Sequence, residues 1–297
     1  GHVPTSSENA TIGVHAYPVK KNDPKNNPVV SANTPAYIVT FGAATPPTLT
    51  VQSGATLTIN TILTINAGAV PIFTTGTGGG SILLASTPSS NAIMYVYGNL
   101  TTTDQLITLQ STVSGSASVG QMTGSISGQV NVQRYLSGQR GYRLIASPVN
   151  ATNGVTDGNG NLPYSLNYVK NSAYITGTTL AAGGFDVSST VTTTSENPTL
   201  YLFREDVPIS NASFISGNFR GVSNLTNAPT YSLNNEASTY TVPVSNGFLF
   251  FFRGDRTKAT FDQETLTSYQ AQAATLTATG YLNQGQIVFK DWYTASS

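Results

Sequence analysis

The chain reads Ser53-Gly54-Ala55-Thr56-Leu57-Thr58-Ile59-Asn60, and the phrase Ile62-Leu63-Thr64-Ile65-Asn66-Ala67-Gly68-Ala69 follows almost as an echo. Leucine and isoleucine recur here with a period of two, and Thr or Asn stands between them. Successive side chains of a β-strand point to opposite faces, so this pattern predicts strands with an apolar inner face and a hydroxyl or amide outer face. The echo is a weak internal repeat.

Charged residues are absent from a long span around these strands. Asn26 to Thr103 contains no Asp, Glu, Lys or Arg, which is 78 residues (103 − 26 + 1), and the whole chain is 9% charged. Ordinary soluble domains are about 25% charged. The span is not a membrane helix, because it holds no run of ~20 apolar residues. It indicates β-sheet with an uncharged polar surface, which suits an extracellular scaffold better than a reaction site.

Composition excludes several classes of function. Lys plus Arg equals Asp plus Glu, at 13 each, and the basic residues are scattered, so we do not expect a nucleic-acid partner. The chain has no cysteine, which excludes disulfides, thiolate metal sites and a cysteine nucleophile. No signal peptide opens the sequence and it does not begin with Met. We therefore expect a processed protein or a fragment of a longer one.

We predict an all-β chain in three parts: an extended N-terminal arm over residues 1–35, a charge-poor β-repeat domain over 36–125 and a β-sandwich-like domain over 126–297. Short alternating strands in the middle part fit a short β-solenoid or a β-sandwich, and the sequence does not choose between them. The predicted strands of the last part are Gln129–Tyr135, Tyr142–Ser147, Thr199–Phe203, Thr239–Val244, Gly247–Arg253, Ala274–Thr279 and Gln286–Lys290. One helix is a candidate, at Asp262–Ala274.

The N-terminal arm is rich in proline, which disfavours helices and central strands. It is expected to be an irregular tail or an arm along a sheet edge. The alternative is an arm that adds a strand to a neighbouring subunit. In that case the added strand would contain Tyr37, Ile38, Val39 and Phe41, or alternatively Val29 and Val30.

Four phrases in the last part resemble surface proteins that Bacteroidota export through the type IX secretion pathway. These phrases are Gly128–Tyr135 with Gly141–Val149, Leu200–Glu205, Ser245–Asp255 and Thr275–Gly285. The resemblance covers about residues 40–297 and implies an adhesin-like protein of the outer cell surface. It supplies no catalytic residue. The Tyr-Pro-Asn-Pro-like sorting domain of such proteins is missing from this sequence.

Few residues are arranged for chemistry. The two histidines, His2 and His15, lie in the predicted arm, and the carboxylates are spread thinly, so we do not expect an enzyme. Asp157, Asn159 and Asn161 have the spacing of a calcium loop, but Leu162 and Tyr168 stand where an EF-hand needs Gly and Glu. A plain Asn/Gly turn is therefore the favoured interpretation, these three residues remain a candidate for a calcium site of another kind, and no other cofactor is expected.

Aromatic residues and one tripeptide are the remaining leads. Alternation predicts Phe248, Phe250 and Phe252 inward and Phe251 outward. Outward aromatic rings would stack on sugars or form a subunit interface, whereas core packing explains the same residues. The candidates are Tyr201, Phe251, Trp292 and Tyr293. Arg253-Gly254-Asp255 is the tripeptide that integrins bind, but a strand end followed by a tight turn is the favoured interpretation.

Taken together, the sequence favours a secreted, non-enzymatic protein of the bacterial surface, either an adhesin or the structural subunit of a filament or surface layer. It would associate with itself or with neighbouring surface proteins through β-edges and polar faces. The alternative is a carbohydrate-binding module or polysaccharide-active enzyme with glycan partners.

Overall fold

The computed structural model describes residues 9–12, 28–42, 48–76, 78–153, 155, 163–177, 183–186, 198–204, 215–216, 218–225, 230–233, 239–244, 246–258 and 270–287. Within these residues the chain is almost entirely β-structure, which confirms the predicted class. It divides into two compact units. The first comprises Gly1–Arg134 and Thr279–Gln286, and the second comprises Tyr135–Ala278 and Ile287–Ser297. The first unit thus extends beyond the predicted boundary at residue 125.

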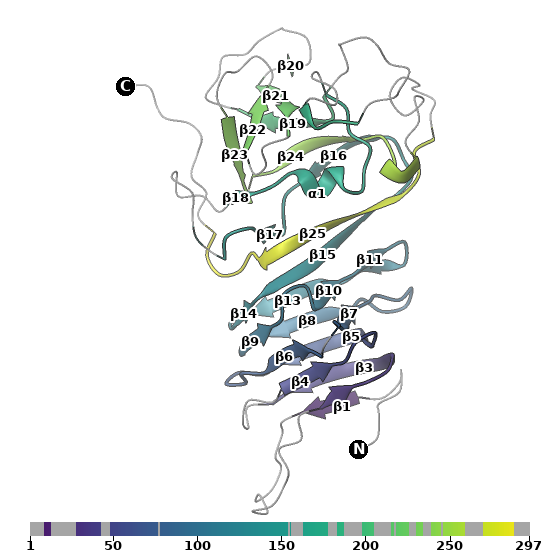
Figure 1. Cartoon of the computed structure of the whole chain (residues 1–297), viewed down its shortest axis with the longest axis vertical. Coiled ribbons are helices and arrows are strands. Elements are labelled where there is room, and N and C mark those ends of the chain that lie inside the picture. The colour runs from purple at the N-terminus through teal and green to yellow at the C-terminus, as the bar shows by residue number, and fades with distance from the viewer. Residues whose placement is uncertain are drawn as a thin grey trace, which may run out of the picture. The chain divides into compact units, whose positions relative to one another are not determined.

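The first unit is a parallel β-solenoid of about four turns, whose strands stack one on the next (Figure 1). One sheet contains the parallel run β1-β3-β5-β7-β10-β15, β8 pairs with β5 and β13 with β8, and the second sheet has the order β14-β9-β6-β4-β2. The strands are β1 (Asn9–Ile12), β2 (Val29–Val30), β3 (Thr34–Phe41), β4 (Thr48–Val51), β5 (Thr56–Ile65), β6 (Ile72–Thr75), β7 (Ser81–Leu84), β8 (Ile93–Val96), β9 (Asn99–Thr102), β10 (Ile107–Leu109), β13 (Ser118–Met122), β14 (Ser125–Ser127), β15 (Gln129–Leu136) and β25 (Ala274–Leu282), with the hairpin β11 (Ser111–Thr112) and β12 (Gly115–Ser116). Residues 36–125 are therefore a solenoid and not a sandwich.

Columns of apolar side chains fill the solenoid. Leu57, Ile82 and Ile107 are register partners on successive turns, 25 residues apart at each step (82 − 57 and 107 − 82). Leu63 and Met94 are also register partners on successive turns, with a longer step of 31 residues (94 − 63). All five side chains are buried. Burying such a side chain contributes about 1.5–3 kcal/mol, so the period-two pattern supplies the main stabilisation of the stack.

Strand β5 serves two neighbours. Its first half pairs with β7 through Thr56–Ile59, and its second half pairs with β8 through Ile62–Ile65. The register against β3 shifts between Ala36 and Ile38, whose partners on β5 are Ile59 and Ile62. The two halves of the sequence echo therefore lie in one strand and not on successive turns. The structural repeat is the longer step from one turn to the next.

Glycines allow the turns to approach closely at one corner. The Gly98 N–H donates to the carbonyl of Ile65 at 3.2 Å, and one turn later the Gly124 N–H donates to the carbonyl of Val96 at 3.0 Å. A Cβ atom on Gly124 would lie 1.8 Å from the Gly98 carbonyl oxygen, and one on Gly98 would lie 2.2 Å from that of Ala69. Only a residue without a side chain fits at these two positions.

The described part of residues 1–35 forms short strands at the edges of the two sheets rather than an irregular tail. Strand β1 pairs in parallel with β3, and β2 pairs in parallel with β4. Strand β3 already begins at Thr34 and accommodates Pro35, which opposes no residue of β1 because that register begins at Ile38. Short parallel pairing thus continues the solenoid despite the prolines.

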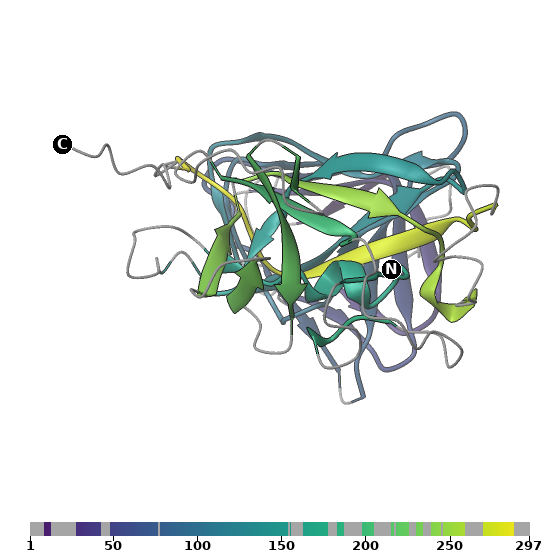
Figure 2. The ribbon, with the colours of Figure 1, turned by 90° about the horizontal axis from the view of Figure 1, so that it is seen from above.

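The second unit contains an antiparallel sheet of order β16-β24-β19-β21-β22-β23-β18, with β20 beside β21. Figure 2 shows these strands, coloured teal to yellow-green, from a second direction. Its elements are β16 (Gly141–Ile145), β17 (Val149–Asn150), β18 (Pro163–Tyr164), α1 (Asn167–Lys170), β19 (Leu200–Phe203), β20 (Ile215–Ser216), β21 (Phe219–Asn224), β22 (Thr230–Leu233), β23 (Thr239–Pro243), β24 (Phe248–Phe252) and the 3-10 helix η2 (Arg256–Lys258).

Alternation places the core of this sheet as predicted. Phe248, Phe250 and Phe252 are at most 2% exposed, which confirms their inward orientation. Most of the helix candidate at Asp262–Ala274 lies outside the described residues. Its last part, from Gln270, is not helical and leads into β25.

Candidate interaction surfaces

Four strands of the second unit place apolar side chains on the face opposite that core. Directly opposed residues of an antiparallel pair share a face, so the register identifies the members. Tyr142 opposes Phe251, Leu144 opposes Leu249, Leu249 opposes Tyr201, and Phe203 opposes Phe219. We call this set the aromatic face: Tyr142, Leu144, Tyr201, Phe203, Phe219, Leu249 and Phe251.

The aromatic face is open to solvent at its rim. Leu144 is 78% exposed, Tyr142 57% and Phe203 43%. The rings pack edge-on, with centroids 4.8 Å apart for Tyr142 and Phe251 and 5.2 Å for Phe203 and Phe219. Exposed apolar side chains gathered on one face are typical of binding surfaces, whereas single ones are ordinary.

Two arginines flank this face. The guanidinium carbons of Arg140 and Arg253 lie 5.4 Å and 5.0 Å from the centre of the Phe251 ring, within the range of a cation–π contact. Burial, and secondarily the neighbouring Tyr142, raises the pKa of Tyr201 to about 12, so its phenol is neutral at physiological pH. Strands β16, β19, β21 and β24 contain no Asp or Glu. The seven residues of the aromatic face are themselves uncharged, and of the two arginines against Phe251, Arg253 is only 6% exposed.

The outer surface of the solenoid carries ladders of small polar groups. The hydroxyls of Thr56 and Ser81 are 2.9 Å apart on adjacent turns, and Ser125 donates to the Asn99 side chain at 2.9 Å. These pairs are register partners, so each turn offers its neighbour a hydrogen bond. Among the described residues of the first unit, the charged ones are Asp104 and Arg134.

The integrin tripeptide is not displayed as a free loop. Arg253 is 6% exposed, and the Gly254 carbonyl accepts a hydrogen bond from Tyr174 N–H at 3.0 Å. The Asp255 carboxylate accepts from the N–H and hydroxyl of Thr257, at 2.8 and 2.9 Å. The tripeptide therefore belongs to a strand end and a turn, the simpler of the two interpretations.

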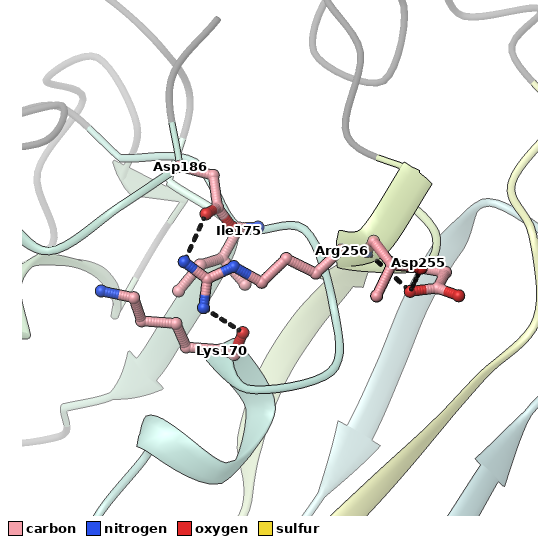
Figure 3. Close-up of polar contacts among 6 residues, drawn as sticks. Lys170, Ile175, Asp186, Asp255 and Arg256 are labelled. Carbon is pink, nitrogen blue, oxygen red and sulfur yellow. Dashed lines mark hydrogen bonds and ion pairs between the residues drawn. The ribbon is translucent and has the colours of Figure 1, made fainter.

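Beside this turn, Arg256 of η2 contacts two other segments of the chain through Lys170 and Asp186, as Figure 3 shows. It forms an ion pair with Asp186 at 3.0 Å and donates to the carbonyl of Lys170 at 3.0 Å. The Ile175 N–H donates to the same carboxylate at 3.0 Å. Burial raises the pKa of Asp186, and this outweighs the opposing effects of Ile175, Arg256 and Lys170. The Arg256 guanidinium and the Asp186 carboxylate both have partners within the fold, so this cluster has a structural role.

The predicted site residues fall into three groups. Val39 and Phe41 are at most 1% exposed in the solenoid core, so alternation turns them inward, which corrects their assignment to an interface; Tyr37, on the outer side, is 41% exposed. Tyr201 and Phe251 come together on the aromatic face. The remaining candidates lie outside the described residues: Trp292, Tyr293 and the calcium candidates Asp157, Asn159 and Asn161.

Most members of the aromatic face were not among the predicted site residues. Tyr142 and Leu144 alternate with Arg143, which signals a strand with one apolar face. That signal does not reveal their partners, because the pairing joins segments about a hundred residues apart in the chain (251 − 142 = 109).

The described residues contain no group of three or more His, Cys, Asp or Glu placed to hold a metal ion. In the same part of the chain, no helix is long and apolar enough to cross a membrane. Comparisons with protein-family models, with curated proteins and with solved structures found no match.

Proposed function

We propose that this chain is a secreted, non-enzymatic protein of the bacterial outer surface that serves as a structural subunit of an extracellular filament or layer. The observation that carries the proposal is the solenoid surface, whose polar groups are hydroxyls and amides rather than charges. The resemblance to surface proteins exported by the type IX pathway supports the location.

The physical basis is the weak repulsion between copies. Net charge keeps proteins apart in solution, and edge strands of monomeric proteins are usually guarded by charged side chains. The described strands β1 and β2 end the two sheets of the solenoid and contain no charged residue. Val29 on β2 is 54% exposed. Such edges offer backbone hydrogen-bond groups to a second copy.

Electron microscopy of negatively stained protein, with light scattering over a concentration series, tests the proposal. We expect regular assemblies whose formation changes little between low and high salt, because screening acts only on charges. Particles that remain monomeric at the highest concentration would remove the assembly function. Assembly that disappears in high salt would show that charged residues drive it instead.

A further inference from the structure

We propose that the side chain of Gln284 caps the β14 edge of the solenoid and prevents a second copy of the chain from adding a strand there. Strand β14 is the last strand of the second sheet, at the end opposite β2. The consequence for assembly rests on the proposed function, whereas the cap itself is tested without it.

The backbone of β14 presents one residue to the free edge of the sheet. Strand β14 pairs in parallel with β9, and Ile126 lies opposite Leu100. The Ser125 N–H donates to the carbonyl of Gly98 at 3.2 Å, so the backbone groups of Ser125 point toward β9. Backbone groups of successive residues in a strand point to opposite sides. The N–H and C=O of Ile126 therefore point away from β9, where the next strand would lie.

The Gln284 side chain binds both of these groups. The Ile126 N–H donates to Oε1 of Gln284 at 2.8 Å, and Nε2 of Gln284 donates to the Ile126 carbonyl at 2.8 Å. A glutamine amide offers the same donor and acceptor as a peptide group. In an antiparallel sheet, two facing residues exchange the same pair of hydrogen bonds. Gln284, which lies 158 residues further along the chain, thus takes the place of an added strand.

The two ends of the second sheet therefore differ. At the other end, the carbonyls of Pro28 and Val30 accept hydrogen bonds from β4 at 3.0 and 2.8 Å, so the backbone groups of Val29 point outward. The Val29 side chain is 54% exposed. Neither β2 nor β14 contains the charged residues that usually guard an edge strand. At β14 the Gln284 amide replaces that protection, which leaves the β2 end as the open edge of this sheet.

Amide hydrogen exchange by NMR, together with light scattering over a concentration series, tests the cap in the full chain. Gln284→Ala should speed exchange of the Ile126 amide about tenfold, which corresponds to about 1.4 kcal/mol, and should leave the Ser125 amide unchanged. The same variant should associate at a lower concentration than the wild type. Gln284→Glu places a charge at the edge and should not promote association. The matched control is Gln286→Ala, since Gln286 is exposed in the same segment and should change neither measurement.

The two measurements separate the cap from the proposed function. Unchanged exchange at Ile126 in Gln284→Ala would refute the cap, and faster exchange without stronger association would refute its role in blocking a second copy. The same effects in Gln286→Ala would also overturn the inference. A wild type that stays monomeric beside a Gln284→Ala variant that associates would support the cap and remove the assembly function. Gln284→Asn, whose amide is one carbon shorter, gives the same test should Gln284→Ala unfold.

Discussion

Replacing Gly124 by alanine should destabilise the solenoid specifically, because this glycine lies where two turns meet. The new Cβ would lie 1.8 Å from the Gly98 carbonyl oxygen. Ordinary C···O contacts are about 3.3–3.6 Å long, so the two turns would have to separate by about 1.5 Å. The Ser125 N–H donates to the same oxygen at 3.2 Å, and this hydrogen bond would lengthen as well.

The expected magnitude follows from three terms. Overpacking costs about 1–3 kcal/mol, and a weakened hydrogen bond adds about 1 kcal/mol. In the opposite direction, alanine lowers the conformational entropy of the unfolded chain, which stabilises the folded state by about 0.4–1 kcal/mol. The net loss for Gly124→Ala is about 1–3 kcal/mol, which corresponds to a fall in melting temperature of about 3–10 °C for a unit of this size.

Differential scanning calorimetry measures the melting temperatures of the wild-type protein and Gly124→Ala, with Gly247→Ala as the control. Neither glycine has a positive φ angle, and the nearest atom to a Cβ on Gly247 is the Ile145 carbonyl oxygen at 3.7 Å, an ordinary contact. We expect the control to keep or slightly raise the melting temperature. If Gly124→Ala unfolds at the wild-type temperature, the close stacking of the turns at this corner is refuted.

Three further perturbations test other parts of the structure. Phe73→Ala should lower the free energy of unfolding, measured in urea, by about 3–5 kcal/mol, since the ring is buried and its centre lies 4.9 Å from the centre of the Phe41 ring. An unchanged urea midpoint would contradict the stacked core. The pKa of Tyr201, about 12, lies above the usual 10, so its contribution to stability is complete below pH 10 and is lost between pH 10 and 12; ultraviolet titration should show a late phenol signal whose amplitude Tyr201→Phe reduces. The raised pKa of Asp186 makes the folded state bind its proton more tightly, so stability relative to Asp186→Asn should increase as pH falls; the opposite slope in urea titrations would refute a dominant effect of burial.

Alternation in the sequence was sufficient to predict the strands that build the inner columns. Leu57 and Ile59 lie inward in β5, and Phe250 lies inward in β24, as the period of two requires. Strands β6 and β9 were not predicted, because they are short and rich in threonine, and their pairing with distant turns decides their conformation.

The candidate site depended on information that a single sequence does not contain. Phe251 and Tyr201 were named as separate candidates, yet they share a face because β24 pairs with β19 and Tyr201 opposes Leu249, two residues from Phe251. Cross-strand register determines which residues meet, and register between distant segments is not readable from local pattern. Val39 was assigned to an interface because the sequence does not show that β3 belongs to the wall of a solenoid, where alternation turns Val39 into the core and leaves Tyr37 outside.

The polar ladders bear on how copies of the solenoid would meet. Pairs such as Thr56 with Ser81 already exchange hydrogen bonds between turns, so the flanks have fewer unsatisfied groups to offer than an edge strand does. Two exposed residues of one sheet distinguish association through edge strands from association through the flanks. Val29 lies on the edge strand β2, and Ile72, 43% exposed, lies on the internal strand β6. If copies join end to end, Val29→Lys should abolish assembly in light scattering while Ile72→Lys leaves it intact. Loss of assembly in Ile72→Lys alone would mean that the flanks join instead, and loss in neither variant would exclude this sheet from the contact.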